Sequence, residues 1–159
     1  MKTPIHYRQG DVLIERIGSL PKKLTPIKRE NGRVILAHGE ATGHVHAFLG
    51  TDTKKFRDDR GREFFEVCGQ EIKVTLLIVR RWKNQIMVNH PDLGIIEFAL
   101  SDVNICGSDA VIDGNFELLK HDEHHALGVP SGYYRGGNDA NGTVRQREYS
   151  PEAIRDVAD

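Results

Sequence analysis

The sequence lacks long apolar runs and has few cysteines. Its longest apolar-rich stretch, Val74–Val79, is far shorter than the roughly 20 residues that span a membrane. The first residues also lack the apolar segment of a secretory signal. Cys68 and Cys106 form no C-x-x-C motif and stand apart from the histidines, which predicts two reduced core thiols and no thiol nucleophile. Together these absences predict a cytoplasmic protein without a membrane span.

Neither sign of charge dominates the chain. The 22 Lys and Arg residues face 23 Asp and Glu residues, which leaves a formal net charge of −1 and no electrostatic signal for duplex binding. No phosphate-cradling G-x-x-x-x-G-K-[ST], G-x-G-x-x-G or G-x-S-x-G motif occurs. The basic segment Arg80–Lys83 surrounds Trp82 and suits stacking on a single strand, although a solvated strand end is the simpler interpretation. Nucleic acid therefore remains an alternative partner that is not favoured.

The chain has no internal repeat, low-complexity tract or linker, so residues 1–159 are expected to form a single β-rich domain. Short apolar runs separated by turn residues favour strands over helices. The charged segment 54–62 is expected to be a loop, and Ser150-Pro151-Glu152 predicts the start of a short C-terminal helix. The expected strands are Asp11–Ile17, Arg33–Ala37, Gly43–Leu49, Glu63–Val67, Glu71–Trp82, Gln85–Val88, Gly94–Leu100, Asn115–Lys120, His125–Val129, Tyr133–Arg135 and Thr143–Tyr149, with a shorter edge segment at Pro26–Arg29. This pattern predicts a mainly β domain, either a barrel or a sandwich.

Six of the eight histidines fall in two groups, and the first contains an H-x-H pair. Because successive side chains of a strand point to opposite faces, His44 and His46 are expected to share one face. Two imidazoles at this spacing lie about 6–7 Å apart at their Cα atoms, so both could reach one cation at about 2.0–2.1 Å. The H-x-H pair therefore predicts half of a metal site.

The second group, HDEHH at residues 121–125, is the expected source of further ligands. If these residues are extended, His121, Glu123 and His125 share a face; if they form a turn, His121 and His124 converge. The sequence leaves both arrangements open. Three imidazoles and a carboxylate suit a divalent ion of Zn, Fe, Mn or Ni, with one position open to water or substrate.

Residues around these histidines suggest a catalytic role for the predicted site. Glu40 and Glu123 are candidates for a general base, and His38 is a candidate ligand, base or turn residue. The favoured hypothesis is a metal-dependent hydrolase acting on a small molecule or phosphoester. A non-catalytic module that binds a metal or small ligand is the main alternative, and histidines that act without metal or only as structural residues are others. Assembly into a homo-oligomer is compatible with the sequence.

Polar clusters at 7–11 and 145–149 predict a cross-strand ion network between the terminal strands, in which Arg8 and Asp11 approach Arg147 and Glu148. An arginine fork for a phosphate or carboxylate is the functional alternative. The turn at residues 130–132 should place Tyr133 and Tyr134 on opposite faces, with one of them packed.

The order of several motifs resembles that of a family of small uncharacterised prokaryotic and phage proteins. These motifs are YRQGDVLI (7–14), HGEATGHVHAF (38–48), HDEH (121–124), VPSGYY (129–134) and VRQREYSPEAIRD (144–156). The resemblance covers nearly the whole chain apart from its middle and implies no activity.

The ligand pattern also resembles that of cupins, small β-barrels that bind a metal through an H-x-H motif and a later Glu and His. His44 and His46 correspond to the H-x-H motif. The carboxylate expected shortly afterwards is absent, and the second histidine group precedes the Pro130-Ser131-Gly132 turn instead of following it. The likeness therefore concerns the kind of ligand and the β architecture.

Overall fold

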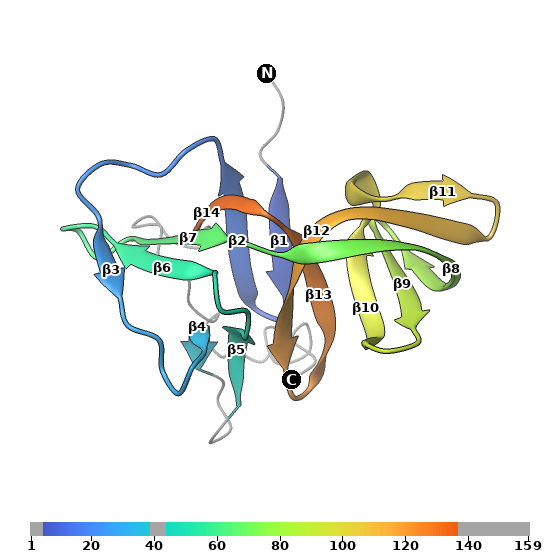
Figure 1. Cartoon of the computed structure of the whole chain (residues 1–159), viewed down its shortest axis with the longest axis horizontal. Helices are drawn as coiled ribbons and strands as arrows, with labels where there is room; N and C mark the ends of the chain where they lie inside the picture. The colour runs from blue at the N-terminus through green and yellow to red at the C-terminus, as the bar shows by residue number, and fades with distance from the viewer. Residues whose placement is uncertain (1–4, 39–43, 137–159) are drawn as a thin grey trace, which may run out of the picture.

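The computed structural model describes residues 5–38 and 44–136, and almost all of its regular structure is β-strand. Within these ranges, six strands form one antiparallel sheet in the order β1-β2-β14-β7-β6-β3 (Figure 1). The strands are β1 (His6–Gln9), β2 (Val12–Ile17), β14 (Gly132–Gly136), β7 (Glu63–Val67), β6 (Lys54–Arg57) and β3 (Thr25–Ile27).

The second sheet closes on itself and forms a barrel. Strands β8 (Gln70–Trp82), β9 (Gln85–His90) and β10 (Gly94–Ala99) follow one another as antiparallel neighbours. Strand β12 (Asp109–His121) pairs with β8, and β13 (His124–Pro130) closes the barrel between β12 and β10. Strands β5 (Val45–Phe48) and β4 (Val34–His38) extend this sheet beyond β12. A 3-10 turn (Leu100–Asp102) and β11 (Asn104–Cys106) connect β10 to β12.

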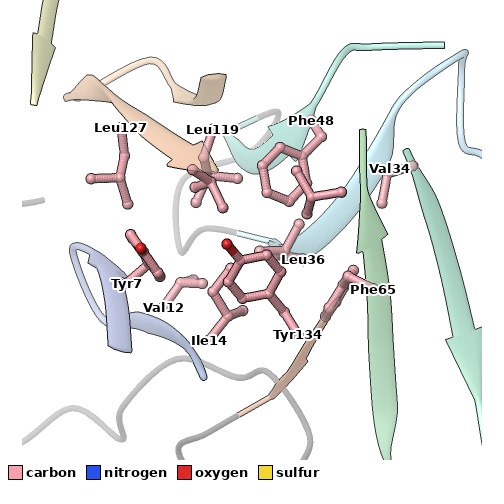
Figure 2. Close-up of a cluster of buried hydrophobic side chains, with 12 residues drawn as sticks. Tyr7, Val12, Ile14, Val34, Leu36, Phe48, Phe65, Leu119, Leu127 and Tyr134 are labelled. Carbon is pink, nitrogen blue, oxygen red and sulfur yellow. The ribbon is translucent and has the colours of Figure 1, made fainter. Parts of the chain in front are cut away.

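Two hydrophobic cores correspond to these two parts of the molecule. The first core lies between the six-stranded sheet, strands β4 and β5, and the ends of β12 and β13 (Figure 2). Its buried side chains are Tyr7, Val12, Ile14, Val34, Leu36, Phe48, Phe65, Val67, Leu119, Leu127, Val129 and Tyr134. The second core fills the barrel and consists of Ile72, Ile86, Val88, Ile96, Phe98, Ala110, Ile112 and Phe116. Strand β12 therefore contributes to both cores, and β13 contributes Leu127 and Val129 to the first.

Two backbone features explain where glycine is required. Asn31 and Gly32 have φ values of 53° and 74°, as expected for a tight turn whose two central residues have positive φ. Gly128 lies inside the barrel, where an added Cβ would come within 2.5 Å of the Phe98 ring. The missing side chain at Gly128 lets Phe98 fill the barrel.

The predicted mainly β fold is confirmed, and the barrel is the alternative that the chain adopts. The prediction of a loop at 54–62 is wrong in part, because Lys54–Arg57 forms β6. Its charges are accommodated by Glu63 on β7, which lies 3.2 Å from Lys55 and 2.9 Å from Arg57. Pairing across strands thus overrode the polar composition.

Several other expectations changed in detail. Strand β12 begins six residues earlier than predicted, at Asp109, and the short strand β11 was missed. Both cysteines are free, but Cys106 is exposed, so its prediction as a core residue is wrong. Tyr134 is buried and Tyr133 exposed, as the turn predicted. The expected strand 143–149 and C-terminal helix lie outside the described residues.

No helix among the described residues is long and apolar enough to cross a membrane.

Candidate functional site

The hairpin between β12 and β13 brings two histidines face to face. His121 and His124 are cross-strand partners, and Asp122 and Glu123 form the turn between them. Directly opposed residues of an antiparallel pair project to the same side of the sheet. Their ring centroids lie 4.8 Å apart. Of the two arrangements that the sequence left open for residues 121–125, the structure contains the turn.

Strand β5 adds a third histidine to this hairpin. Its pairing with β12, in which Ala47 lies opposite Lys120, places His46 beside the β12 end. The His46 ring stacks on the His121 ring at 4.1 Å between centroids and lies 5.7 Å from the His124 ring. One ring nitrogen from each of these three residues lies within 4.8 Å of the other two. We call His46, His121 and His124 the histidine cluster.

A glutamine from β1 fixes the protonation state of His46. The Gln9 amide nitrogen donates to the backbone oxygens of Leu119 at 2.8 Å and His125 at 3.0 Å. Its Oε1 must then be the group that faces Nδ1 of His46, at 2.9 Å. Because that oxygen can only accept, Nδ1 carries the proton and Nε2 holds a lone pair. Nε2 is buried and has no hydrogen-bond partner among the described residues.

Burial keeps His46 neutral. The side chain is fully buried, and desolvation followed by the nearby His121 and His124 rings lowers its pKa from 6.5 to about 3. Asp11 is also buried, with Oδ1 3.9 Å from Nε2 of His46. That distance is too long for a hydrogen bond, and the attraction does not offset the cost of burying a positive ring. His46 therefore presents an unprotonated nitrogen at neutral pH.

His121 is arranged differently. Its Nδ1 accepts a hydrogen bond from the backbone N–H of Glu123 at 3.0 Å, so a neutral ring carries its proton on Nε2. Coordination through Nε2 would need that proton to leave or to move to Nδ1, with loss of the Glu123 bond. A hydrogen bond of this kind contributes about 0.5–1.5 kcal/mol. The cost is small beside the free energy of a metal–imidazole bond.

His44 and Glu123 lie on the exposed side of the cluster. Nδ1 of His44 lies 2.5 Å from Oε1 of Glu123, and Nε2 lies 3.7 Å from Oδ2 of Asp122. The His44 ring also packs edge-on against the His121 ring, with 5.9 Å between the ring centroids. These side chains are partly exposed, whereas His46 is closed off from solvent. Access from solvent is therefore on the side of His44 and Glu123.

The other predicted site residues have different positions. His125 is exposed on β13 and does not belong to the cluster; its backbone oxygen, not its ring, contributes by accepting the bond from Gln9. The backbone of His38 pairs with Val45 at the end of β4. Glu40 lies outside the described residues. The roles suggested for His38 and Glu40 stay predictions.

Gln9 and Asp11 were not predicted to belong to the histidine site. The sequence suggested an ion network for Asp11 with Arg147 and Glu148, which lie outside the described residues. The signal available was the Gln9-Gly10-Asp11 turn, in which Gly10 has a φ of 59°. That turn places both side chains beside His46, but the sequence separation of 37 between Gln9 and His46 hides the contact from any local pattern.

The geometry of the histidine cluster can be compared with the requirements of a metal ion. Two nitrogens that bind one ion at about 2.1 Å can lie at most about 4.2 Å apart. A pair of nitrogens separated by the full 4.8 Å therefore has to approach by at least ~0.6 Å, and by more in a tetrahedral site. The stacked His46 and His121 rings also have to rotate relative to each other, because their planes lie 27° apart.

The chain belongs to the family described as "Domain of unknown function (DUF8820)", whose model matches residues 8–99. Comparison with curated proteins and with solved structures found no match. The matched range includes Gln9, His44 and His46 and ends before His121 and His124. The expected resemblance to an uncharacterised family is confirmed to this extent, whereas the prokaryotic or phage source and the cupin-like ligand pattern stay predictions.

Proposed function

We propose that the protein binds a divalent transition metal through His46, His121 and His124 and uses it to hydrolyse a small-molecule ester or phosphoester. One observation carries the metal site: a buried, unprotonated Nε2 of His46 without a hydrogen-bond partner among the described residues, beside two further imidazoles. A buried nitrogen lone pair that meets no donor costs free energy. A metal ion supplies the missing partner.

Gln9 supports this assignment because it does what outer partners of metal-bound histidines usually do. Its Oε1 accepts a hydrogen bond from Nδ1–H of His46, which fixes the ring orientation and leaves Nε2 free to coordinate. Its own amide is held by two backbone carbonyls, so the arrangement is preorganised before any ion arrives. A histidine with a purely structural role would not need its second nitrogen left open.

The nature of the ligands limits which metals fit. Three neutral imidazoles are borderline donors that suit Zn, Fe, Mn or Ni better than Ca or Mg. Asp11, with Oδ1 3.9 Å from Nε2 of His46, offers a carboxylate at the buried side. Three protein ligands leave a coordination position for water, and a bound metal lowers the pKa of that water.

The exposed side of the cluster carries the groups for proton transfer. Glu123 lies between His121 and His124 in sequence, on the turn, and contacts His44. A carboxylate at this position accepts a proton from an attacking water, and the His44 ring orients that carboxylate. A small substrate reaches the site from this side because His46 closes the other.

Metal analysis tests the site. Purified protein is stripped with a chelator, loaded separately with Zn, Mn, Fe and Ni, desalted and analysed for bound metal. We expect one ion per chain for the wild type and loss of stoichiometric binding for His46→Ala and His124→Ala. His125→Ala is the matched control, since its side chain is outside the cluster, and it should retain the ion. Absence of metal from the wild type, or equal binding by all variants, contradicts the proposal.

Turnover separates a hydrolase from a binding module. The loaded protein is assayed on activated carboxylic and phosphate esters, with Glu123→Gln as the key variant. Loss of rate by about 10²-fold or more with metal content unchanged is expected for a general base. Stoichiometric metal without turnover on any of these esters would refute the hydrolase and leave the binding module.

A further inference from the structure

The topology of the barrel identifies one of its faces as a candidate binding surface. Strands β8, β9 and β10 are consecutive hairpins, β12 returns to lie beside β8, and β13 closes the ring parallel to β10. This is a five-stranded Greek-key barrel. In such barrels the face of the second and third strands, with the loops joining strands one to two and four to five, binds oligonucleotides or oligosaccharides. Here that face belongs to β9 and β10.

A fold does not fix a function, so the side chains on this face have to supply the chemistry. Outward positions are paired across the three strands: Trp82 with Gln85, Arg80 with Met87, and Met87 with Glu97. They alternate with the residues that fill the barrel, which are Ile86, Val88, Ile96 and Phe98. A surface hollow is lined by Arg80, Trp82, Gln85, Ile86, Met87 and Glu97.

Trp82 is the centre of this face. Its side chain is 59% exposed, which is unusual for the largest aromatic residue. The Arg80 guanidinium lies 5.8 Å and the Lys83 ammonium 5.6 Å from the ring centroid. Lys83 has a φ of 52°, a conformation that the tight β8–β9 turn demands and that glycine or asparagine adopts more readily. Arg81 pairs with the barrel residue Ile86, so it projects to the other side of the strand from Arg80 and Trp82.

The hollow continues beyond this face. A second hollow shares Gln85 with the first and extends over Asn84 towards His6 and Leu100. On the other side, Glu97 pairs with Leu127 of β13. The hollowed surface is therefore longer than one aromatic ring, as an extended ligand requires.

The charges around Trp82 indicate which of the ligands bound by such barrels fits this face. The two cations beside the indole ring, Arg80 and Lys83, outnumber the one carboxylate of the hollow, Glu97, on a chain whose formal net charge is −1. Phosphates are attracted by such a local excess, whereas a neutral oligosaccharide gains nothing from it. An exposed indole stacks on an unpaired base, whose faces a duplex would cover. Both features favour a single strand.

We propose that the outer face of β8, β9 and β10, centred on Trp82, binds single-stranded nucleic acid by base stacking on the indole ring and by contacts of Arg80 and Lys83 with phosphates. The binding needs no metal ion, and it is independent of the histidine cluster.

The sequence offers a direct measurement, because Trp82 is the only tryptophan of the chain. A 12-nucleotide single-stranded DNA of mixed sequence is titrated into the full-length protein at low salt, with chelator present, and indole fluorescence is followed. We expect saturable quenching that weakens with salt. Two phosphate contacts give a slope of log K against log salt of about −1.4, at about 0.7 for each contact. No quenching at low salt overturns the proposal.

Single substitutions then distinguish the contribution of base stacking to DNA binding from that of charge. Trp82→Ala should weaken binding about 5- to 150-fold when followed by anisotropy of a labelled strand. Arg80→Gln and Lys83→Gln should each reduce the salt slope by about 0.7, and Glu97→Gln should strengthen binding. Tyr133→Ala, an exposed aromatic on the other sheet, is the matched control and should bind as the wild type does.

Three further outcomes would overturn the proposal. Equal affinity for the corresponding duplex would exclude stacking on free bases. Salt-independent quenching by a neutral oligosaccharide, without a response to DNA, would assign the face to sugars. Loss of binding in His46→Ala would contradict its independence from the histidine cluster.

Discussion

The histidine cluster and the Trp82 face occupy opposite extremes of exposure in one small protein. His46 is fully buried and held by Gln9, whereas Trp82 is 59% exposed and has cations as its neighbours. The cluster belongs to the margin of the first core, where β5 and the β12–β13 hairpin meet. The Trp82 face is the outer surface of the barrel around the second core.

This difference shows how burial determines which ligand each region suits. The histidine cluster is closed on the side of His46 and open only on the side of His44 and Glu123, so its buried imidazoles suit an ion and a small substrate. An open face cannot exclude water, so it relies on ring area and on several cations that act together. The two regions should therefore respond to pH, salt, metal and mutation in opposite ways.

The largest expected difference is in the response to acid. In metal-free protein, the pKa of His46 falls from 6.5 in the unfolded chain to about 3, because burial and the His121 and His124 rings disfavour the charged form. Its contribution to stability is complete above pH 6.5 and is lost as pH falls towards 3. The free energy of unfolding should drop by on the order of 4 kcal/mol over this range from His46 alone. Denaturant unfolding at a series of pH values measures it.

The control for this experiment is the same series on His46→Asn and on Trp82→Phe. Asn at position 46 does not titrate, so this variant should lose that part of the pH dependence even if it is less stable at pH 7. Trp82→Phe should keep the wild-type dependence. Identical pH dependence in wild type and His46→Asn would show that the ring is not held neutral by its surroundings, which include Asp11 and Gln9.

Metal should stabilise one region without altering the other. At a free metal concentration 100 times the Kd, binding to the folded state raises the free energy of unfolding by about 2.7 kcal/mol. Thermal unfolding with and without Zn should show this shift in the wild type and in Trp82→Ala, and not in His124→Ala. Single-strand binding should be the same with and without Zn. A change in DNA affinity on metal loading would show that the two regions are coupled.

Replacement of Gln9 tests how far the cluster is preorganised. Gln9→Ala removes the acceptor for His46 Nδ1 and should weaken metal binding by about 10- to 100-fold, or about 1.4–2.7 kcal/mol. Gln9→Glu keeps an acceptor for His46 but cannot donate to the carbonyls of Leu119 and His125. We therefore expect it to bind metal more tightly than Gln9→Ala while both variants are less stable than wild type. Competition titration with a chromophoric chelator gives the affinities, and equal affinities for wild type and Gln9→Ala would contradict the assigned role.

The smallest expected effect is on stability at the open face. Trp82→Ala and Arg80→Gln remove side chains that lie on the surface, so the free energy of unfolding should change by no more than about 0.5 kcal/mol. The same substitutions are those that weaken DNA binding most. Chemical denaturation beside the anisotropy titration makes the comparison. Destabilisation by several kcal/mol would show that Trp82 packs as a core residue.

Much of the fold could be predicted from local pattern. Strands such as Glu63–Val67 and β13 could be predicted from short apolar runs between turn residues. The turn at Asn31-Gly32 could be predicted because these two residues readily adopt the positive φ values that they have in the structure. Strand β6 could not be predicted in this way, because Lys55 and Arg57 look like loop residues until Glu63 is placed beside them. The closure of the barrel was equally inaccessible, since it depends on β13 lying parallel to a strand about 30 residues earlier.

The candidate site could be predicted only in part. Its two halves were visible as H-x-H and HDEHH, since histidine density is a local property. Whether His124 or His125 joins His121 could not be predicted, because it depends on the turn at Asp122 and Glu123. That turn makes His124 the cross-strand partner of His121, so these two rings project to the same side of the sheet. Gln9 was missed because its contact with His46 spans 37 positions.

The sequence by itself determined the chemical types: a β-rich domain, two groups of histidines, and one tryptophan among cations. These follow from residue identity and from periodicity over a few positions. Only the tertiary structure decided which groups meet, because cross-strand pairing joins residues far apart in the chain. It buried His46 against His121 and His124, and it left Trp82 on the open face of a closed barrel. Strand β12 contributes to both cores, with Leu119 in the first and Ala110, Ile112 and Phe116 in the second.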